Sequence, residues 1–456
     1  MNVEVVTSTT PRLRNGLATI AIHLPELGAH EVVDLDFDAL YQIAAEPDPL
    51  VTDLVIIASI CYVLDKSVPR RRADDFWTRR FEVEFPVSIP WQWQEASQAL
   101  TTALEFLTGD EWSIGFRERP DNLFLSPRQS RDRRSLARID AVGLFSGGID
   151  SLVGTLDHLF GEEGQLALVG HHDASGPSGD QGRVHAALSA LPGYGDRTRR
   201  IAVRLRPLPA TLTQLGQDVT PTGREHTLRS RSLVFLALGL YAARSIGPGT
   251  PILAPENGFI AVNIPLTAAR IGTCSTRTMH PYFLEKMGDL IEALGLSHPI
   301  RNTLAFKTKG ESLAECRDSA ALVHLLSETV SCAHASRRAT WFRRQARNCG
   351  YCVPCLIRRA ALHHIAQDNG IDYGVDILAE ELDLDANVAA DVRAMMDCLD
   401  QVRSEADLEE RVLLTGPLPF AERGVYAAMV GRGLDELRAL ISDKGRVDLQ
   451  QRIGMP

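Results

Sequence analysis

The sequence has no long hydrophobic run. Every apolar stretch is shorter than the roughly 18 residues that a helix needs to cross a bilayer. The N-terminal segment, MNVEVVTSTTPRLRN, also lacks the apolar core and small-residue cleavage site of a secretory signal. We therefore expect a cytoplasmic protein that neither spans a membrane nor anchors to one.

Basic charge is not in excess, and neither internal repeats nor low-complexity tracts occur. The formal net charge of −10 disfavours non-specific binding to nucleic acid. A hydrophobic fraction of 45% and a charged fraction of 23% are those of an ordinary globular protein. The 456 residues exceed what one hydrophobic core usually supports, so we expect two or three domains.

A glycine pair follows a strand-like run at Ala141–Leu144. Helical spacing of apolar residues begins at Leu152, which makes the segment between them a turn from strand to helix. The glycines lack the Cβ atoms that would keep an anion from the backbone, and the first amides of the helix point toward such an anion. The spacing is neither the GxxxxGKS/T of a Walker loop nor GxGxxG. The segment predicts a phosphate-binding turn, the alternative being a solvated Gly/Ser turn; it reads FSGGIDS and comprises Phe145, Ser146, Gly147, Gly148, Ile149, Asp150 and Ser151.

The hydrophobic pattern divides the chain into three parts. Residues 1–135 combine strand-like and helical segments and predict an α+β domain, which ends in a polar linker at 128–135. Residues 136–370 predict the catalytic domain. Residues 371–456 are helical in pattern and predict a tail packed on the body, with helices at Val375–Leu382, Ala390–Val402 and Val425–Ile441.

The middle part alternates strand-like and helical runs. The alternation predicts an α/β fold, a doubly wound parallel sheet with helices on both faces. Its strands are expected at Ala141–Leu144, Leu166–His171, Arg200–Leu205 and Pro251–Ala254. Ligands of such sheets bind beyond the carboxyl ends of the strands. The glycine turn, His171 and Glu256 all fall at that edge.

Four of the eight cysteines are clustered. Cys349, Cys352 and Cys355 form CxxCxxC, and Cys332 precedes them. Thiolates at this spacing, closed by a fourth from an adjacent segment, predict a structural zinc site, although an iron–sulfur cluster also takes four thiolates. The other cysteines stand singly; Cys61, Cys316 and Cys398 are expected in the core, and Cys274 either in the core or near a substrate.

The FSGGIDS turn resembles the SGGxDS loop of the PP-loop ATP pyrophosphatases. Together with the later CGYCVPC segment it resembles the 7-cyano-7-deazaguanine synthase (QueC) family. Three further stretches agree with that family: LRSRSLVFLALG at 228–239, ENGFIAVNIPL at 256–266 and KTKGE at 307–311. The resemblance covers residues 139–367. The additional N- and C-terminal parts resemble the longer QueC-like proteins of bacterial anti-phage operons, the QatC type.

This resemblance implies an ATP- and Mg²⁺-dependent carbon–nitrogen ligase. A 7-deazaguanine carboxylate would be adenylated, ammonia would give the amide, and a second ATP could give the nitrile. The FSGGIDS turn would hold the pyrophosphate, and Asp150 would position either the start of the helix or the metal ion. Lys307 and Lys309 would neutralise phosphate charge, unless they lie in a solvated loop.

The resemblance also implies residues that contact the substrate and the nucleotide. Glu256, with Asn257 and Phe259, would bind the base through its N–H edge and a stacking face; Glu256 could instead cap a loop. His171 would line the adenine pocket, or else have a purely structural role. Arg229 and Arg231 would meet a phosphate or the substrate carboxylate, or else lie at a surface helix start.

The acceptor of the activated group is open. The segment HHDASGPSGDQGRVH at 171–185 departs from the family pattern, retaining only Gln181, Arg183 and His185. A partner protein from the same operon could supply an amine and form a base–protein conjugate. Two more functions stay open for the chain, a tRNA-modifying enzyme and an ATP-sensing defence scaffold.

Overall fold

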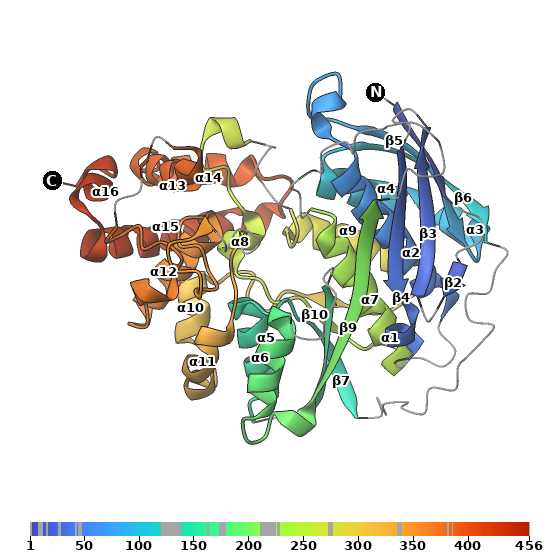
Figure 1. The fold of residues 1–456 in the computed structure, drawn as a ribbon, viewed down its shortest axis with the longest axis horizontal. Helices are drawn as coiled ribbons and strands as arrows, with labels where there is room; N and C mark the ends of the chain where they lie inside the picture. The colour runs from blue at the N-terminus through green and yellow to red at the C-terminus, as the bar shows by residue number, and fades with distance from the viewer. Residues whose placement is uncertain are drawn as a thin grey trace.

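A computed structural model gives the fold of the 456-residue chain. It describes residues 2–7, 12–14, 17–25, 29–41, 43, 48–119, 138–161, 164–172, 179–209, 225, 229–271, 277–334, 340–380, 383–384 and 386–455. Within them the protein is mixed α/β, built on one large sheet that is rich in parallel pairs (Figure 1).

The sheet has 11 strands in the order β11-β10-β7-β8-β9-β4-β3-β1-β5-β6, with β2 paired to β3. They are β1 (Asn2–Thr7), β2 (Arg12–Arg14), β3 (Leu17–Leu24), β4 (Ala29–Asp36), β5 (Arg80–Val87), β6 (Glu111–Glu118), β7 (Ile139–Leu144), β8 (Gln165–His172), β9 (Thr198–Pro209), β10 (Ile252–Leu253) and β11 (Ile300–Arg301). The helices are α1 (Phe37–Tyr41), α2 (Pro49–Ser67), α3 (Pro90–Glu95), α4 (Ser97–Thr108), α5 (Ile149–Leu159), α6 (Asp180–Ser189), α7 (Arg231–Ile246), α8 (Gly258–Val262), α9 (Pro281–Ala293), α10 (Lys309–Ala314), α11 (Ser319–Leu325), α12 (Val353–His364), α13 (Ala390–Gln401), α14 (Glu405–Leu413), α15 (Arg423–Lys444) and α16 (Val447–Arg452).

The parallel part of the sheet is wound in two directions from β7. Its registers pair Val142 of β7 with Ile252 of β10, and Leu144 with Val169 of β8. The chain proceeds from β7 to β8 and β9 on one side, then crosses to β10 and β11 on the other. The strand order therefore reverses between β7 and β10, and the carboxyl ends of these two strands flank a topological switch point.

Both faces of the parallel strands are buried. Leu166 and Leu168 of β8 face the core beneath α5 and α6, whereas Ala167 and Val169 face the core shared with α2 and α7. Burial on both faces is why the strand sequence is almost continuously apolar. The expected parallel-rich α/β sheet is confirmed at this level.

The N-terminal strands continue the same sheet. β4 pairs antiparallel with β9, with Leu35 opposite Leu205, and α2 packs on α7. Residues from both parts contribute to one hydrophobic core. The division of the chain at residue 135 stays a prediction, because residues 120–137, including the expected linker, lie outside the described part.

The C-terminal helices α13–α16 pack with α8 and α12 around a separate core, at the left of Figure 1. The helix expected at Val375–Leu382 is wrong for the described residues 375–380, which form a turn. There the Asp376 carboxylate accepts from Leu378 N at 3.2 Å and binds Arg359, while Glu380 accepts from Asp376 N at 3.1 Å. Such side-chain hydrogen bonds compete with the helix.

Candidate functional site

The glycine turn joins β7 to α5 at the switch point. Phe145 is buried, and its N–H donates to Val169 O at 2.8 Å, so the turn begins as a continuation of the sheet. Gly147 has φ +81°, a left-handed conformation that favours glycine. A Cβ on Gly147 would lie 3.0 Å from Gln181 N. The turn thus passes too close to the first residues of α6 for a larger side chain.

Two hydroxyl groups brace the turn. Ser146 Oγ accepts from Gly148 N at 3.3 Å, and Ser151 Oγ donates to Gly148 O at 2.9 Å. Ser146 is exposed, Gly148 half-buried, and Ile149 fully buried beneath them. The first turn of α5 therefore faces open space at Ser146 and Gly148. Helix amides and the positive end of the helix dipole at such a place favour an anion.

Three polar side chains converge on Asp150 in this first turn. Lys309 Nζ, 1% exposed, forms a buried ion pair with Asp150 Oδ2. Asn257 Nδ2 donates to the same oxygen at 3.2 Å, while its Oδ1 caps α8 by accepting from Ile260 N at 3.1 Å. Glu256 contributes a second carboxyl group next to that of Asp150. When both carboxyl groups are ionised, the buried Asp150 Oδ1 accepts no hydrogen bond from a described residue.

Glu256 is the second carboxyl group of the site. Burial raises its pKa well above the ordinary value, and the adjacent negative charge of Asp150 raises it further, against the opposing effect of Lys309. The backbone of Glu256 is fixed by Asn302 at the end of β11, which accepts from Glu256 N at 3.1 Å and donates to Glu256 O at 2.9 Å. Glu256 as a whole residue is half-buried, and Asp150 is buried.

Two of the predicted residues make contacts of their own. Lys307 pairs at 2.8 Å with Glu315 in a half-exposed position. Phe259 is 4% exposed and packs against Gly433 of α15 in the C-terminal core. The structure therefore brings Lys309, Glu256 and Asn257 to Asp150, but not Lys307 or the ring of Phe259.

The remaining predicted residues lie on the face of the sheet that α2 and α7 cover. His171 is buried, with its ring 5.2 Å from that of Tyr62 and 5.8 Å from that of Phe235. Arg231 lies over the same Phe235 ring at 5.3 Å and is half-buried.

Arg229 belongs to a buried cluster of arginines and aspartates next to α4. It donates to Thr108 O at 2.8 Å and lies 4.9 Å from the Trp77 ring. Burial lowers its pKa to about 10, and the neighbouring Arg70 lowers it as well. Arg229 thus connects α7 to the N-terminal part rather than lying at a surface helix start.

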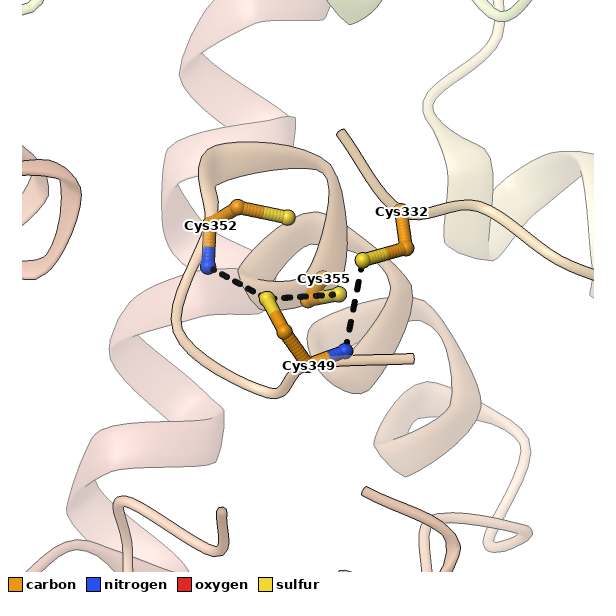
Figure 2. A group of neighbouring side chains, drawn as sticks. All are labelled: Cys332, Cys349, Cys352 and Cys355. Carbon is orange, nitrogen blue, oxygen red and sulfur yellow. Dashed lines mark hydrogen bonds between the residues drawn. The ribbon is translucent and has the colours of Figure 1, made fainter. Parts of the chain in front are cut away.

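The four clustered cysteines converge (Figure 2). Their Sγ atoms all lie within 4.8 Å of one another, and all four are free thiols. A tetrahedral site with Zn–S bonds of about 2.3 Å needs sulfur atoms about 3.8 Å apart, close to this arrangement. Cys349 and Cys355 are already 3.7 Å apart. The cluster can hold a metal ion such as zinc.

Backbone amides support the sulfur atoms. Tyr351 N and Cys352 N donate to Cys349 Sγ at 3.4 and 3.3 Å, and Cys349 N donates to Cys332 Sγ at 3.3 Å. Burial raises the pKa of Cys349, but hydrogen bonds within the cluster outweigh burial and lower it below the ordinary value. A lowered pKa favours the thiolate form that binds a metal ion, whereas hydrogen bonds within the cluster and burial raise the pKa of Cys352 and Cys355.

The segment that precedes Cys332 contacts the glycine turn. Val330 N donates to Gly147 O at 3.1 Å, and the next residue, Ser331, precedes Cys332 and offers its carbonyl to Cys355 Sγ at 3.9 Å. Arg358 of α12 fixes the same segment by donating to Thr329 Oγ1 at 2.8 Å. A metal ion held by the cysteines would therefore stabilise the segment that supports the turn.

Sequence reasoning missed Asn302, Val330 and Glu436, which position the site. Glu436 of α15 accepts from Thr308 and Gly310 at the start of α10. The capping box of Thr308 and Glu311 is a local signal that could have placed this helix start. The other contacts join distant segments, and no local pattern marks them.

Comparison of the chain with protein-family models, curated proteins and solved structures finds no match. Cys274 lies outside the described residues. Within the described part, no helix combines the length and apolar character required to cross a membrane.

Proposed function

We propose that this protein is an ATP-dependent carbon–nitrogen ligase of the PP-loop type, similar to the QueC family. It would adenylate the carboxylate of a 7-deazaguanine and convert it to the amide. The observation that carries the proposal is the convergence of the glycine turn, Lys309, Asp150 and Glu256 at the switch point between β7 and β10. A small ligand of a doubly wound sheet binds at this place.

The turn has the chemistry to bind the β,γ-pyrophosphate of ATP. The backbone at Gly147 and Gly148, the hydroxyls of Ser146 and Ser151 and the first amides of α5 would donate to phosphate oxygens. Lys309 would neutralise charge as pyrophosphate leaves. The carboxylate oxygen bonds to the α-phosphorus and pyrophosphate departs; ammonia then attacks the carbonyl carbon, and AMP leaves with that oxygen. A second ATP would drive dehydration to the nitrile.

Asp150 fits a divalent cation. The buried Asp150 Oδ1 is without a hydrogen bond from a described residue when both carboxyl groups are ionised, and carboxylate oxygens are the ligands that Mg²⁺ prefers. When bound, Mg²⁺ supplies charge neutralisation and orientation of the phosphates. Cation binding would also favour the ionised form of Glu256, whose pKa is raised in its absence.

Glu256 is the strongest candidate for recognising the base. A guanine-like edge presents a ring N–H and an exocyclic amine, and an ionised carboxylate can accept from both. Arg231, half-buried at the start of α7, remains a candidate for the substrate carboxylate.

Zinc is the proposed metal of the cysteine cluster, in a structural role. Four thiolates complete a closed tetrahedral shell and leave no open position for catalysis. The contact of Val330 with Gly147 supports this role, because the segment next to the cluster braces the turn.

The biological setting is also a proposal. The segments 1–135 and 371–456 extend the chain beyond the part that resembles QueC, as in proteins of bacterial anti-phage defence, which act in the cytoplasm. If a protein amine attacked the same adenylate in place of ammonia, the product would be a base–protein conjugate.

The test is incubation of the protein with ATP, Mg²⁺, ammonia and 7-carboxy-7-deazaguanine, with pyrophosphate measured and products identified by mass spectrometry. We expect pyrophosphate, AMP and the amide or nitrile, and none of them from Asp150→Ala. If no combination of this carboxylate with ammonia or with an amine-bearing partner protein yields pyrophosphate, the proposal is wrong.

A further inference from the structure

The start of α10 determines where Lys309 lies. Thr308 caps the helix through a capping box with Glu311, and Lys309 is the first helical residue. Its ammonium group reaches Asp150 only because the helix begins at this point and in this orientation. α10 has six residues, so its own hydrogen bonds fix it weakly.

Glu436 of α15 binds this helix start on both sides of Lys309. One carboxylate oxygen accepts from Thr308 Oγ1, and the other accepts from Gly310 N at 3.2 Å. Glu436 is half-buried, where hydrogen bonds to a charged group are stronger than at the surface. Glu436 thus joins the C-terminal helices to the two residues that flank the predicted phosphate-binding lysine.

The glycine of KTKGE is explained by this contact. A Cβ built on Gly310 would overlap the Glu436 carboxylate. The backbone of Gly310 is helical, so alanine would suit α10 itself better than glycine does. Gly310 is therefore required by the approach of Glu436 and not by the local conformation.

We propose that Glu436 is a positioning residue for Lys309, through which helix α15 holds the phosphate-side lysine against Asp150. The effect of Glu436 on the placement of Lys309 is inferred from its hydrogen bonds to Thr308 and Gly310. Its consequence for ATP rests on the function proposed above.

The placement of Lys309 can be tested without any assay of function. The variants are Glu436→Ala, which removes the carboxylate, and Gly310→Ala, which displaces it without altering either Glu436 or Lys309. The matched control is Asp435→Ala, at the neighbouring residue of α15, which removes an exposed carboxylate that pairs with Arg438 at 2.9 Å. Such surface pairs contribute little. The readouts are the rate of Lys309 acetylation by an amine-reactive reagent and amide hydrogen exchange over residues 308–314.

We expect both test variants to accelerate Lys309 acetylation and exchange in α10 by at least about tenfold, the effect of losing one or both of the hydrogen bonds to the charged Glu436. Asp435→Ala should change either rate by less than about twofold. Glu436→Gln keeps one acceptor oxygen, so its acetylation and exchange rates should lie between those of wild type and Glu436→Ala. Wild-type rates in both Glu436→Ala and Gly310→Ala would overturn the inference.

Kinetics separate this inference from the proposed function. If the protein is an ATP pyrophosphatase, Glu436→Ala should lower kcat for pyrophosphate release by about tenfold, and Glu436→Gln should restore part of it. If wild-type protein releases no pyrophosphate, the proposed function fails, while the acetylation rates still decide the role of Glu436.

Discussion

Replacement of Gly147 by alanine should destabilise the protein through its backbone. Gly147 has φ +81°, where a side chain costs about 1–2 kcal/mol. The new Cβ would lie 3.0 Å from Gln181 N and 3.1 Å from Asp180 C, both backbone atoms that cannot rotate away. Crowding of this kind costs about 1–3 kcal/mol more. The free energy of unfolding should therefore fall by about 2–5 kcal/mol.

Urea denaturation followed by circular dichroism measures this loss. The matched control is Gly179→Ala, at the residue that precedes Asp180 and caps α6. Gly179 has φ −62°, and a Cβ there would meet nothing within 4 Å. Its replacement should lower the unfolding free energy by only about 0.5–1 kcal/mol, because alanine is a poorer N-cap residue than glycine. Equal stability of the Gly147→Ala and Gly179→Ala variants would refute the geometry of the turn.

Three further predictions concern charge and metal. Lys309→Met leaves the buried Asp150 carboxylate without its cation and should cost about 3–5 kcal/mol in urea denaturation, against little change for the surface variant Lys286→Met. Cys349→Ser should abolish the binding of one metal ion per chain, measured by elemental analysis, and lower the melting temperature; retention of metal in this variant would contradict the site. The pKa of Glu256 is raised above 4.5 in the folded protein, so the unfolded chain loses this proton more readily and stability falls as the pH rises. The melting temperature of Glu256→Gln should therefore exceed that of wild type at about pH 8 and equal it at about pH 4. A melting difference that does not depend on pH would refute the assigned shift.

The elements that the sequence predicts well are those with local signals. The run Ala141–Leu144 and the glycine pair define β7 and its turn within a few residues, and the CxxCxxC spacing defines the cysteine cluster. In the turn and in the CxxCxxC part of the cluster the atoms that meet are close in the chain, so side-chain type and spacing suffice.

The choice between Lys307 and Lys309 could not be made from sequence. Both lie in KTKGE, and only the phase of α10, set by the Thr308 cap, directs Lys309 to Asp150 while Lys307 pairs with Glu315. The pairing of β9 with β4 was likewise not predictable, because strand partners distant in the chain leave no periodic signal in either segment.

Arg229 and Phe259 illustrate a different limit. A basic residue at a helix start and an aromatic residue after a carboxylate are compatible with ligand binding, but also with burial between elements. The cluster around Thr108 and the close approach of Gly433 to Phe259 decide their placement, and both partners are more than a hundred residues away.

The most direct test of the proposed adenylation follows the oxygen of the substrate carboxylate. 7-Carboxy-7-deazaguanine labelled with heavy oxygen in its carboxylate is incubated with ATP, Mg²⁺ and ammonia, and the nucleotide products are analysed by mass spectrometry. Adenylation predicts AMP that carries one labelled oxygen, together with unlabelled pyrophosphate. Label in inorganic phosphate with ADP as the nucleotide product, or AMP without label, would contradict it.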